Sequence, residues 1–196
     1  MPLAHAILAS LELQPMTGYD LKKFFDLSVG HFWTTTQSHI YKALNDLENE
    51  GWVEKKTIAQ DDKPNRKEYS ITKTGRAELR RWLITPLPPA PVREAWLIQL
   101  FFSHTSVDEE IAALIEERGK NIREIVDAYK AQTKVAIPED LPPGLERARA
   151  LWQITLDYGL AFYQFELKWN KEMLERVKNL PTLKKQSLSK KLTGEI

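Results

Sequence analysis

The segment that decides the fold reads TQSHIYKALNDLENEGWV and covers residues 36–53. Its apolar residues Ile40, Leu44 and Leu47 recur at the spacing of one face of an α-helix. The other face carries hydroxyl, amide and amine groups, on Ser38, Tyr41, Lys42, Asn45 and Asn49. Helices that enter the major groove of DNA use such groups to reach base edges and phosphates. We therefore predict an amphipathic helix with one side in a core and one side free for recognition.

Both ends of this helix carry boundary residues. Thr36 suits the N-cap, because its hydroxyl can accept a hydrogen bond from a backbone N–H of the first turn. Gly51 suits the position where a left-handed residue closes a helix. Residues 52–59 and 68–71 then predict two strands, and the turn formers between them, QDDKPNRK, predict a β-hairpin.

The hairpin lies in a locally basic region. The whole chain has 28 Lys and Arg against 27 Asp and Glu, and this net charge of +1 excludes a general affinity for polyanions. Between residues 55 and 81, nine Lys or Arg stand against four Asp or Glu, a local charge of +5. A solvated hairpin is the simpler explanation when this region is taken alone. Its place directly after a candidate recognition helix favours a DNA-binding wing.

The same region is flanked by further helices. Residues 3–13 predict a first helix, residues 18–29 a second one capped by Thr17, and residues 73–83 another one capped by Thr72. Together with the hairpin they predict a winged helix-turn-helix domain over residues 1–85, with a two-stranded wing.

Residues 86–91 contain four prolines, which predict an extended linker. Beyond it no strand pattern occurs, and helices are expected over residues 92–103, 107–134 and 145–179. The fold class is therefore mainly α, with an all-α C-terminal domain over residues 92–180. The lysine-rich tail, 181–196, is expected to be flexible.

The last of these helices carries two apolar stripes. One contains Leu151, Ile154, Tyr158, Phe162, Phe165 and Trp169, and the other contains Trp152, Leu156, Leu160, Tyr163, Leu167 and Leu174. One stripe serves the helix's own domain, so the second indicates a further partner, most simply a second copy of the chain. We take Trp152, Leu156, Leu160, Tyr163 and Leu167 as the candidate interface, while the pattern alone does not decide between the stripes. A central helix in a monomeric bundle is the alternative.

Several classes of protein are excluded. The chain has no cysteine, its four histidines lack metal-ligand spacing, and neither a nucleophile elbow nor a Gly-rich phosphate loop occurs. We expect no enzyme activity, no metal and no cofactor. No apolar run approaches the roughly 18 residues of a membrane span, and no secretion signal is visible, so we expect a cytoplasmic protein.

The chain resembles a known family in several segments. The motifs MTGYDL at 16–21, FW at 32–33, IYKALNDLENEGWV at 40–53 and RKEYSITKTG at 66–75 closely resemble the PadR-like transcriptional regulators. REAWL at 93–97 and the segment 159–169 are similar to the longer subfamily of phenolic-acid repressors and virulence activators. The resemblance implies a winged helix-turn-helix, a dimer built by C-terminal helices, a partly palindromic operator and, often, a small-molecule effector.

The resemblance also implies roles for individual residues. The predicted DNA contacts are Thr36, Gln37, Ser38, Tyr41, Lys42 and Asn45 on the helix and Lys63, Asn65, Arg66 and Lys67 on the wing. Tyr69 and Trp52 are expected to pack the hairpin onto the helices. A small aromatic effector is expected near Trp96, Trp152, Phe162 and Trp169, although these rings could also simply be core residues.

Two functions therefore compete. The first is a dimeric repressor that binds double-stranded DNA and is released by a small-molecule effector. The second is a winged-helix adaptor that binds proteins without reading DNA, which the near-neutral total charge would allow.

Overall fold

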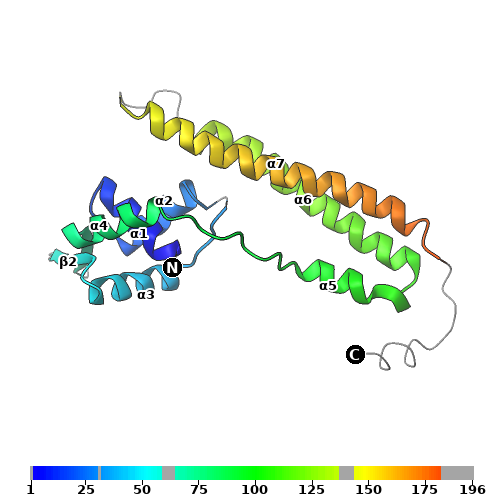
Figure 1. Ribbon diagram of the computed structural model, residues 1–196, viewed down its shortest axis with the longest axis horizontal. Helices are drawn as coiled ribbons and strands as arrows, with labels where there is room; N and C mark the ends of the chain where they lie inside the picture. The colour runs from blue at the N-terminus through cyan, green and yellow to red at the C-terminus, as the bar shows by residue number, and fades with distance from the viewer. Residues whose placement is uncertain (1, 31, 59–64, 137–143, 182–196) are drawn as a thin grey trace. The chain divides into compact units, whose positions relative to one another are not determined.

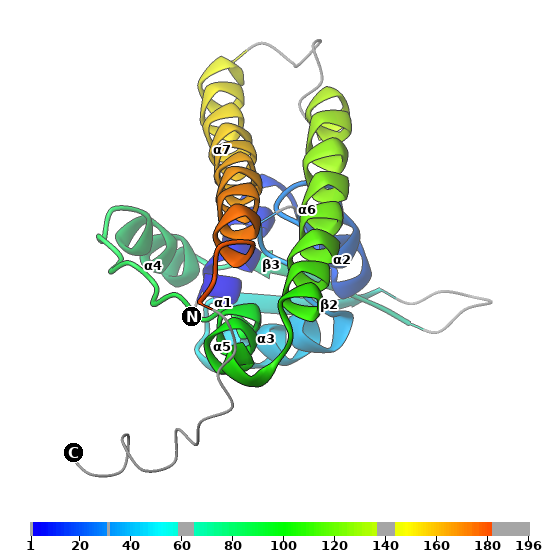
Figure 2. The same ribbon diagram turned by 90° about the vertical axis from the view of Figure 1, so that its right-hand side faces the viewer.

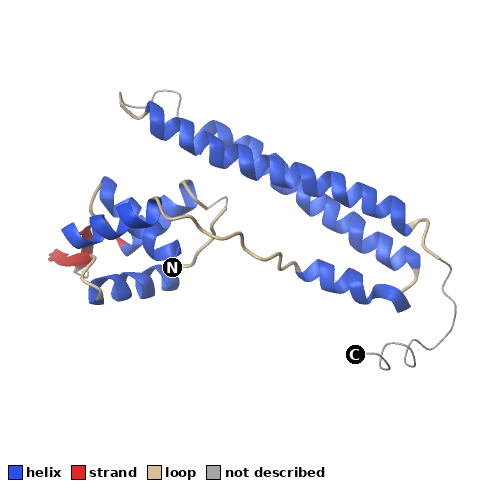
Figure 3. Cartoon of the chain, in the orientation of Figure 1, coloured by secondary structure: helices blue, strands red, loops and turns tan. Residues whose placement is uncertain are grey.

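The chain forms two compact units, Met1–Ala90 and Pro91–Ile196. The computed structural model describes residues 2–30, 32–58, 65–136 and 144–181. Within these residues the strands all belong to the first unit, and the second unit is helical (Figures 1 and 3). The predicted fold class, a winged helix-turn-helix followed by an all-α domain, is confirmed. The predicted flexible tail lies almost entirely outside the described residues.

The first unit contains four helices and three strands among its described residues. They are α1 (Pro2–Leu13), β1 (Met16–Thr17), α2 (Gly18–Leu27), α3 (Gln37–Asn49), β2 (Val53–Ile58), β3 (Arg66–Ile71) and α4 (Lys73–Leu83). Thr17, Thr36 and Thr72 cap α2, α3 and α4 through their side chains, as their positions in the sequence predict. The element types agree with the prediction, and most of the bounds agree within two residues.

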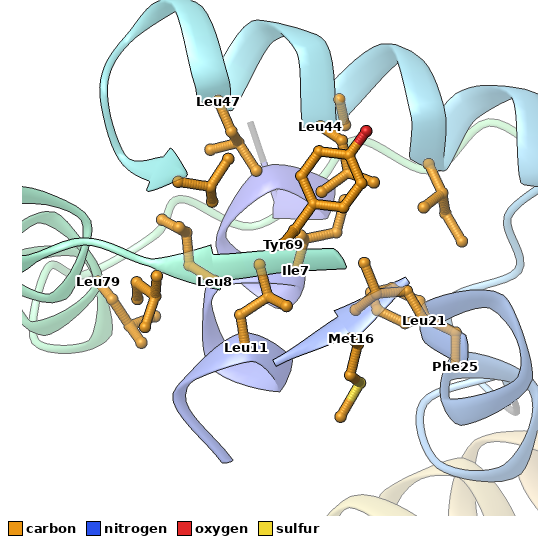
Figure 4. Packing of buried hydrophobic residues seen from close by; sticks show 14 residues of the cluster. Ile7, Leu8, Leu11, Met16, Leu21, Phe25, Leu44, Leu47, Tyr69 and Leu79 are labelled. Carbon is orange, nitrogen blue, oxygen red and sulfur yellow. The ribbon is translucent and has the colours of Figure 1, made fainter. Parts of the chain in front are cut away.

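The core of the first unit is built around α1. Ile7 and Leu8 are completely buried, and Leu11 is 2% exposed. They pack against the apolar faces of α2 and α3 and against the inner side of the sheet (Figure 4). The other buried members of this cluster are Met16, Leu21, Phe25, Ile40, Ala43, Leu44, Leu47, Val53, Tyr69, Ile71 and Leu79. Tyr69 and, more peripherally, Trp52 therefore pack the hairpin onto the helices, as predicted.

The sheet has one strand more than the predicted wing. β1 pairs antiparallel with β3, with Met16 opposite Tyr69 and Thr17 opposite Glu68, so that the strand order is β1-β3-β2. The hairpin itself pairs Val53 with Ile71 and Ile58 with Arg66. A strand of two residues shows no alternation in the sequence, which explains why it was not predicted.

A tight junction joins the hairpin to α4. Gly51 ends α3 with a φ of 70°, the left-handed conformation predicted for it. Its carbonyl accepts hydrogen bonds of 2.8 Å from the hydroxyls of Thr72 and Thr74. The Trp52 carbonyl accepts one from Thr72 N–H at 3.0 Å. The first turn of α4 is thereby fixed to the end of α3.

The second unit is a pair of long helices with a short one beside it. Its elements are α5 (Ala95–Phe102), the 3-10 turn η1 (Ser103–Thr105), α6 (Asp108–Ala136) and α7 (Glu146–Val177). Helices α6 and α7 run side by side in opposite directions (Figures 1 and 2). α5 contains no fully buried residue, although Trp96 and Leu100 are packed against an apolar cluster of α6 and α7.

A polar group lies inside the α6–α7 contact. The amide of Asn170, 6% exposed, donates a hydrogen bond of 2.8 Å to the Ile115 carbonyl. Arg118 forms an ion pair with Glu166. These contacts fix how far α6 and α7 are shifted along each other, because any other alignment of the two helices would leave buried polar groups unpaired.

The two apolar stripes of α7 have different surroundings. In the second stripe, Leu156 is buried and the ring of Tyr163 lies 5.4 Å from that of Tyr129 in α6. Most residues of the first stripe are exposed: Leu151, Ile154, Tyr158, Phe162 and Phe165. α6 therefore covers part of the second stripe, which contains the predicted dimer interface, and no cover of the first stripe is found within the described residues. Trp152, at the free edge of the second stripe, is 40% exposed.

Candidate nucleic-acid interface

The predicted recognition face is the exposed side of α3. The helix starts at the Thr36 cap, whose hydroxyl accepts a hydrogen bond from His39 N–H at 3.3 Å. Ile40, Leu44 and Leu47 are at most 1% exposed, which anchors the helix on the core. The remaining side is in contact with solvent through the predicted residues Thr36, Gln37, Ser38, Tyr41, Lys42 and Asn45. The structure brings all six onto one surface.

Tyr41 differs from the other five residues. Its side chain is 39% exposed, and its ring lies over Gly18 at the start of α2. A Cβ atom on Gly18 would come within 2.4 Å of a ring carbon of Tyr41. The ring is therefore partly a support for α3, and only its remaining part is available to a ligand.

The start of α2 is fixed by a capping box. Asp20 N–H donates to the Thr17 hydroxyl at 3.1 Å, and Thr17 N–H donates to the Asp20 carboxylate at 3.1 Å. The Thr17 hydroxyl also donates to this carboxylate, at 2.7 Å. The hydrogen bonds from Thr17, followed by the nearby Arg66, lower the pKa of Asp20. Asp20 is therefore held as an anion.

Arg66 connects this capping box to the wing. Its Nη2 atom lies 2.6 Å from Oδ2 of Asp20, and the two side chains are 46% and 40% exposed. Thr17 and Glu68 are paired residues of β1 and β3, which explains why the start of β3 lies near the start of α2. Asp20 was not predicted as part of the site. The Thr17-x-x-Asp20 spacing reveals the capping box, but no sequence signal links Asp20 to a residue 46 positions away.

The basic charge of residues 55–81, on the hairpin and α4, is partly neutralised. Lys55, Arg66, Arg76 and Arg81 form ion pairs with Glu48, Asp20, Glu12 and Glu78. The other described cations between residues 55 and 81 are exposed and have no ion pair in the described residues: Lys56, Lys67, Lys73 and Arg80. On the wing, Asn65, Arg66 and Lys67 are exposed as predicted, and Lys63 lies outside the described residues.

The charge of Lys55 is paired within the first unit. Its ammonium lies 2.7 Å from Glu48, a residue of α3, and this hydrogen bond raises the pKa of Lys55. The contact joins β2 to the recognition helix. The hairpin and α3 are thus held together by charge as well as by the core.

The second unit contains two hollows beside Trp96. One has a volume of about 310 Å³ and is lined by α5, α6, Ser103 and Met173, and its polar lining residues are Gln99, Ser103, Glu117, Arg118 and Asn121. The other, of about 390 Å³, is lined mainly by α5, η1 and α7 and includes Trp169. Arg118 lies 4.0 Å from the centre of the Trp96 ring, and Arg176 lies 5.0 Å from that of Trp169.

These hollows include only part of the predicted effector set. Trp96 and Trp169 line them, whereas Trp152 and Phe162 line neither and are 40% and 43% exposed on α7. Neither hollow contains all four rings.

The described ranges were also searched for metal sites and for membrane-spanning helices. No group of three or more potential metal ligands is found there. In the same ranges, no helix is both long and apolar enough to cross a membrane.

The two units each match a family model. The PadR-like family of transcriptional regulators matches residues 7–81, and the virulence activator alpha C-terminal domain matches residues 92–178. The "probable transcriptional regulator Rv1176c" of Mycobacterium tuberculosis is 33% identical over 189 residues, or 89% of this chain and 97% of that protein. The chain belongs to the PadR-like family. Its relatives are transcriptional regulators, so the prediction that it is not an enzyme is confirmed.

A second relative and three solved structures extend the comparison. The negative transcriptional regulator PadR of Bacillus subtilis is 32% identical over 141 residues, covering 69% of this chain and 78% of that protein. Its structure with operator DNA has a TM-score of 0.75 and 24% sequence identity, and the match covers 90% of this chain and 99% of that one. Its structure with p-coumaric acid has a TM-score of 0.71, 22% identity and coverage of 90% and 94%. The virulence activator AphA of Vibrio cholerae has a TM-score of 0.71, 27% identity and coverage of 91% and 99%.

Proposed function

We propose that this PadR-like protein is a homodimeric, sequence-specific DNA-binding repressor whose binding is released by a small molecule. The observation that carries the proposal is the exposed polar face of α3, fixed beside the basic β2–β3 hairpin. The Bacillus subtilis relative is a negative regulator with a structure on operator DNA, which supports the same role here. A repressor of this kind acts in the cytoplasm, where the DNA is.

The exposed residues divide into two chemical groups. Asn45 and Ser38 offer hydrogen-bonding groups suited to base edges, and Lys42 can reach either a base or a phosphate. Thr36 and Gln37 at the start of α3 are suited to the DNA backbone, because helix N-termini attract phosphates. Asn65, Arg66 and Lys67 of the wing supply further phosphate contacts, together with the predicted Lys63. Tyr41 contributes its exposed edge.

Selection of bound fragments from genomic DNA, followed by fluorescence anisotropy over a salt series, tests this assignment. Lys67→Ala should weaken binding uniformly and reduce the slope of log affinity against log salt by about one. Asn45→Ala should change which bases are preferred. Lack of detectable binding, or binding that does not depend on salt, would contradict the proposal and favour the protein-binding adaptor.

The dimer is assigned to the first stripe of α7. Ile154, Tyr158 and Phe165 are 62%, 71% and 57% exposed, and an apolar strip of this kind indicates an interaction surface. Since α6 covers much of the second stripe, the first stripe is the better interface, with Trp152 at its edge. A two-fold dimer would present α3 twice, ideally about 34 Å apart for one turn of DNA.

Analytical ultracentrifugation tests the dimer. Phe165→Glu places a charge in the first stripe and should convert the dimer to monomer, with a corresponding loss of operator affinity. Gln164→Glu, one residue away and also exposed, is the matched control and should leave the dimer intact. If both variants dimerise like the wild type, the interface lies elsewhere.

The effector is assigned to the hollows beside Trp96. Each has an indole covered by an arginine, and both volumes suit a small aromatic molecule. An effector can release the operator only by preferring a form of the protein that binds DNA less well. The p-coumaric acid complex of the Bacillus relative makes that acid a reasonable first probe.

Calorimetric titration with p-coumaric acid, together with operator release, tests this part. Trp96→Leu should abolish binding, whereas Trp152→Leu, outside both hollows, should bind the probe as the wild type does. A planar cationic dye tests whether charge matters. Flat titrations with both probes would remove the support for this pocket.

A further inference from the structure

One carboxylate oxygen of Asp20 accepts three hydrogen bonds. Oδ2 accepts from Thr17 Oγ1 at 2.7 Å, from Thr17 N–H at 3.1 Å and from Arg66 Nη2 at 2.6 Å. Thr17 is buried at 8% exposure and is also paired with Glu68 in the sheet. The carboxylate therefore has a fixed place between α2 and β3, set by backbone and side-chain contacts that do not involve Arg66.

Arg66 keeps most of its hydrogen-bonding capacity. A guanidinium has five N–H donors, and the contact with Asp20 engages Nη2 alone. No other hydrogen bond or ion pair of the Arg66 side chain is found among the described residues. The group is held in one orientation while its other donors stay available, and 46% of its side chain is exposed.

This arrangement lies next to the recognition helix. Gly18, two residues before Asp20, carries the ring of Tyr41 from α3. The start of α2 therefore contacts both the outer face of α3, through Gly18 and Tyr41, and the first residue of β3, through Asp20 and Arg66. An anionic ligand long enough to extend from α3 past the start of α2, such as a DNA duplex, could contact both groups of residues.

We propose that Asp20 is a positioning residue for DNA binding: it orients the Arg66 guanidinium so that its free N–H groups meet a phosphate of the bound duplex. This inference rests on the proposed function. The capping box accounts for an acidic residue at this position, and the contact with Arg66 gives the same carboxylate a second role. A preorganised donor loses less conformational freedom on binding, which can outweigh the unfavourable charge of a carboxylate near DNA.

The sign of the effect separates positioning from simple charge repulsion. Asp20→Asn removes one negative charge but leaves an amide oxygen that can still accept from Thr17. If Asp20 only repels DNA, this change strengthens binding in every background. If Asp20 acts through Arg66, the change weakens binding, and only while Arg66 is present.

A double-mutant cycle on the full chain tests this with the fragments that the wild type binds. Asp20→Asn should weaken binding about threefold or more and lower the salt slope toward that of Arg66→Ala. Added to Arg66→Ala it should cause no further weakening. Added to Lys67→Ala, the adjacent exposed cation without a contact to Asp20, it should weaken binding as much as in the wild type. Asp20→Glu, which keeps the charge and the capping-box pattern, should restore most of the affinity.

Thermal unfolding of each variant shows whether a loss of DNA affinity comes from a destabilised fold instead of the missing Asp20–Arg66 contact. Stronger binding by Asp20→Asn, or equal weakening with and without Arg66, would overturn the inference. A wild-type protein that binds no fragment would instead contradict the proposed function itself, and this inference with it.

Discussion

The two units of the chain differ in how completely they bury their apolar residues. In the first, α1 is enclosed by three helices and a sheet, and residues such as Ile7, Leu21 and Leu44 are fully buried. In the second, α5 has no fully buried residue, and one stripe of α7 is exposed along much of its length. The first unit therefore buries its apolar residues within one chain, whereas the second unit leaves an exposed apolar stripe that the proposed dimer would cover.

Separating the units should give the largest effect. A fragment of residues 1–90 should fold as a monomer with a melting temperature independent of concentration. A fragment of residues 91–196 should be stabilised as a dimer, by about 1.4 kcal/mol for each tenfold rise in concentration. Circular dichroism melts over a concentration series measure both. A concentration-independent melt of the second fragment would show that its exposed stripe needs no partner.

The same substitution in each unit should sharpen the contrast. Leu44→Ala removes a side chain with 0% exposure and should cost about 2–5 kcal/mol of unfolding free energy. Leu151→Ala, at a position 53% exposed, should change the stability of the monomer by no more than about 0.5 kcal/mol. It should nevertheless weaken the dimer. Urea unfolding and ultracentrifugation distinguish the two effects, and equal losses of monomer stability would contradict the contrast.

The sequence predicted the first unit better than the second for a physical reason. Caps such as Thr36 and Gly51 act within a few residues, so local spacing is enough to recognise them. Burial of Ile40 and Leu44 follows from a single apolar face. In α7 both stripes are apolar, and nothing local decides which of them α6 covers. That choice depends on contacts such as Gly159 against Tyr129, between residues 30 positions apart in the chain.

The candidate interface shows the same limit. Exposure of Lys42 and Asn45 followed from helical periodicity, and the exposed wing residues followed from turn chemistry. The partners of the charges did not follow, because Lys55–Glu48 and Arg66–Asp20 join elements that only the fold brings together. The local charge of +5 therefore overstated how many cations are free for DNA.

Two glycines offer a smaller comparison between the units. A Cβ on Gly75 would lie 2.1 Å from the Trp52 carbonyl oxygen, which Thr72 N–H holds in place, so Gly75→Ala should cost about 1–3 kcal/mol. A Cβ on Gly159 would lie 2.4 Å from a ring carbon of Tyr129. This contact is with a side chain instead of a backbone carbonyl, and alanine favours a helix by up to about 1 kcal/mol over glycine, so Gly159→Ala should cost less. Urea unfolding ranks the two variants, and the reverse order would contradict this account.

The smallest expected effect is on acid stability. Glu78 lies 2.6 Å from Arg81 and 2.9 Å from His5, which stacks on Trp82, and these hydrogen bonds lower the pKa of Glu78 from 4.5 to about 2. Because the folded pKa is the lower one, the stabilisation is present above pH 4.5 and is lost as the pH falls toward 2.

Glu78→Gln should therefore lose stability at pH 6 and show a flatter decline between pH 5 and pH 3 than the wild type, measured by urea unfolding. Glu175→Gln in the second unit is the matched control. The pKa of Glu175 is also lowered, by Lys178, but its side chain is 61% exposed, so water and salt screen the pair. Equal slopes for the two variants would mean that the partly buried Glu78 contact contributes no more than a surface pair to the contact between α1 and α4.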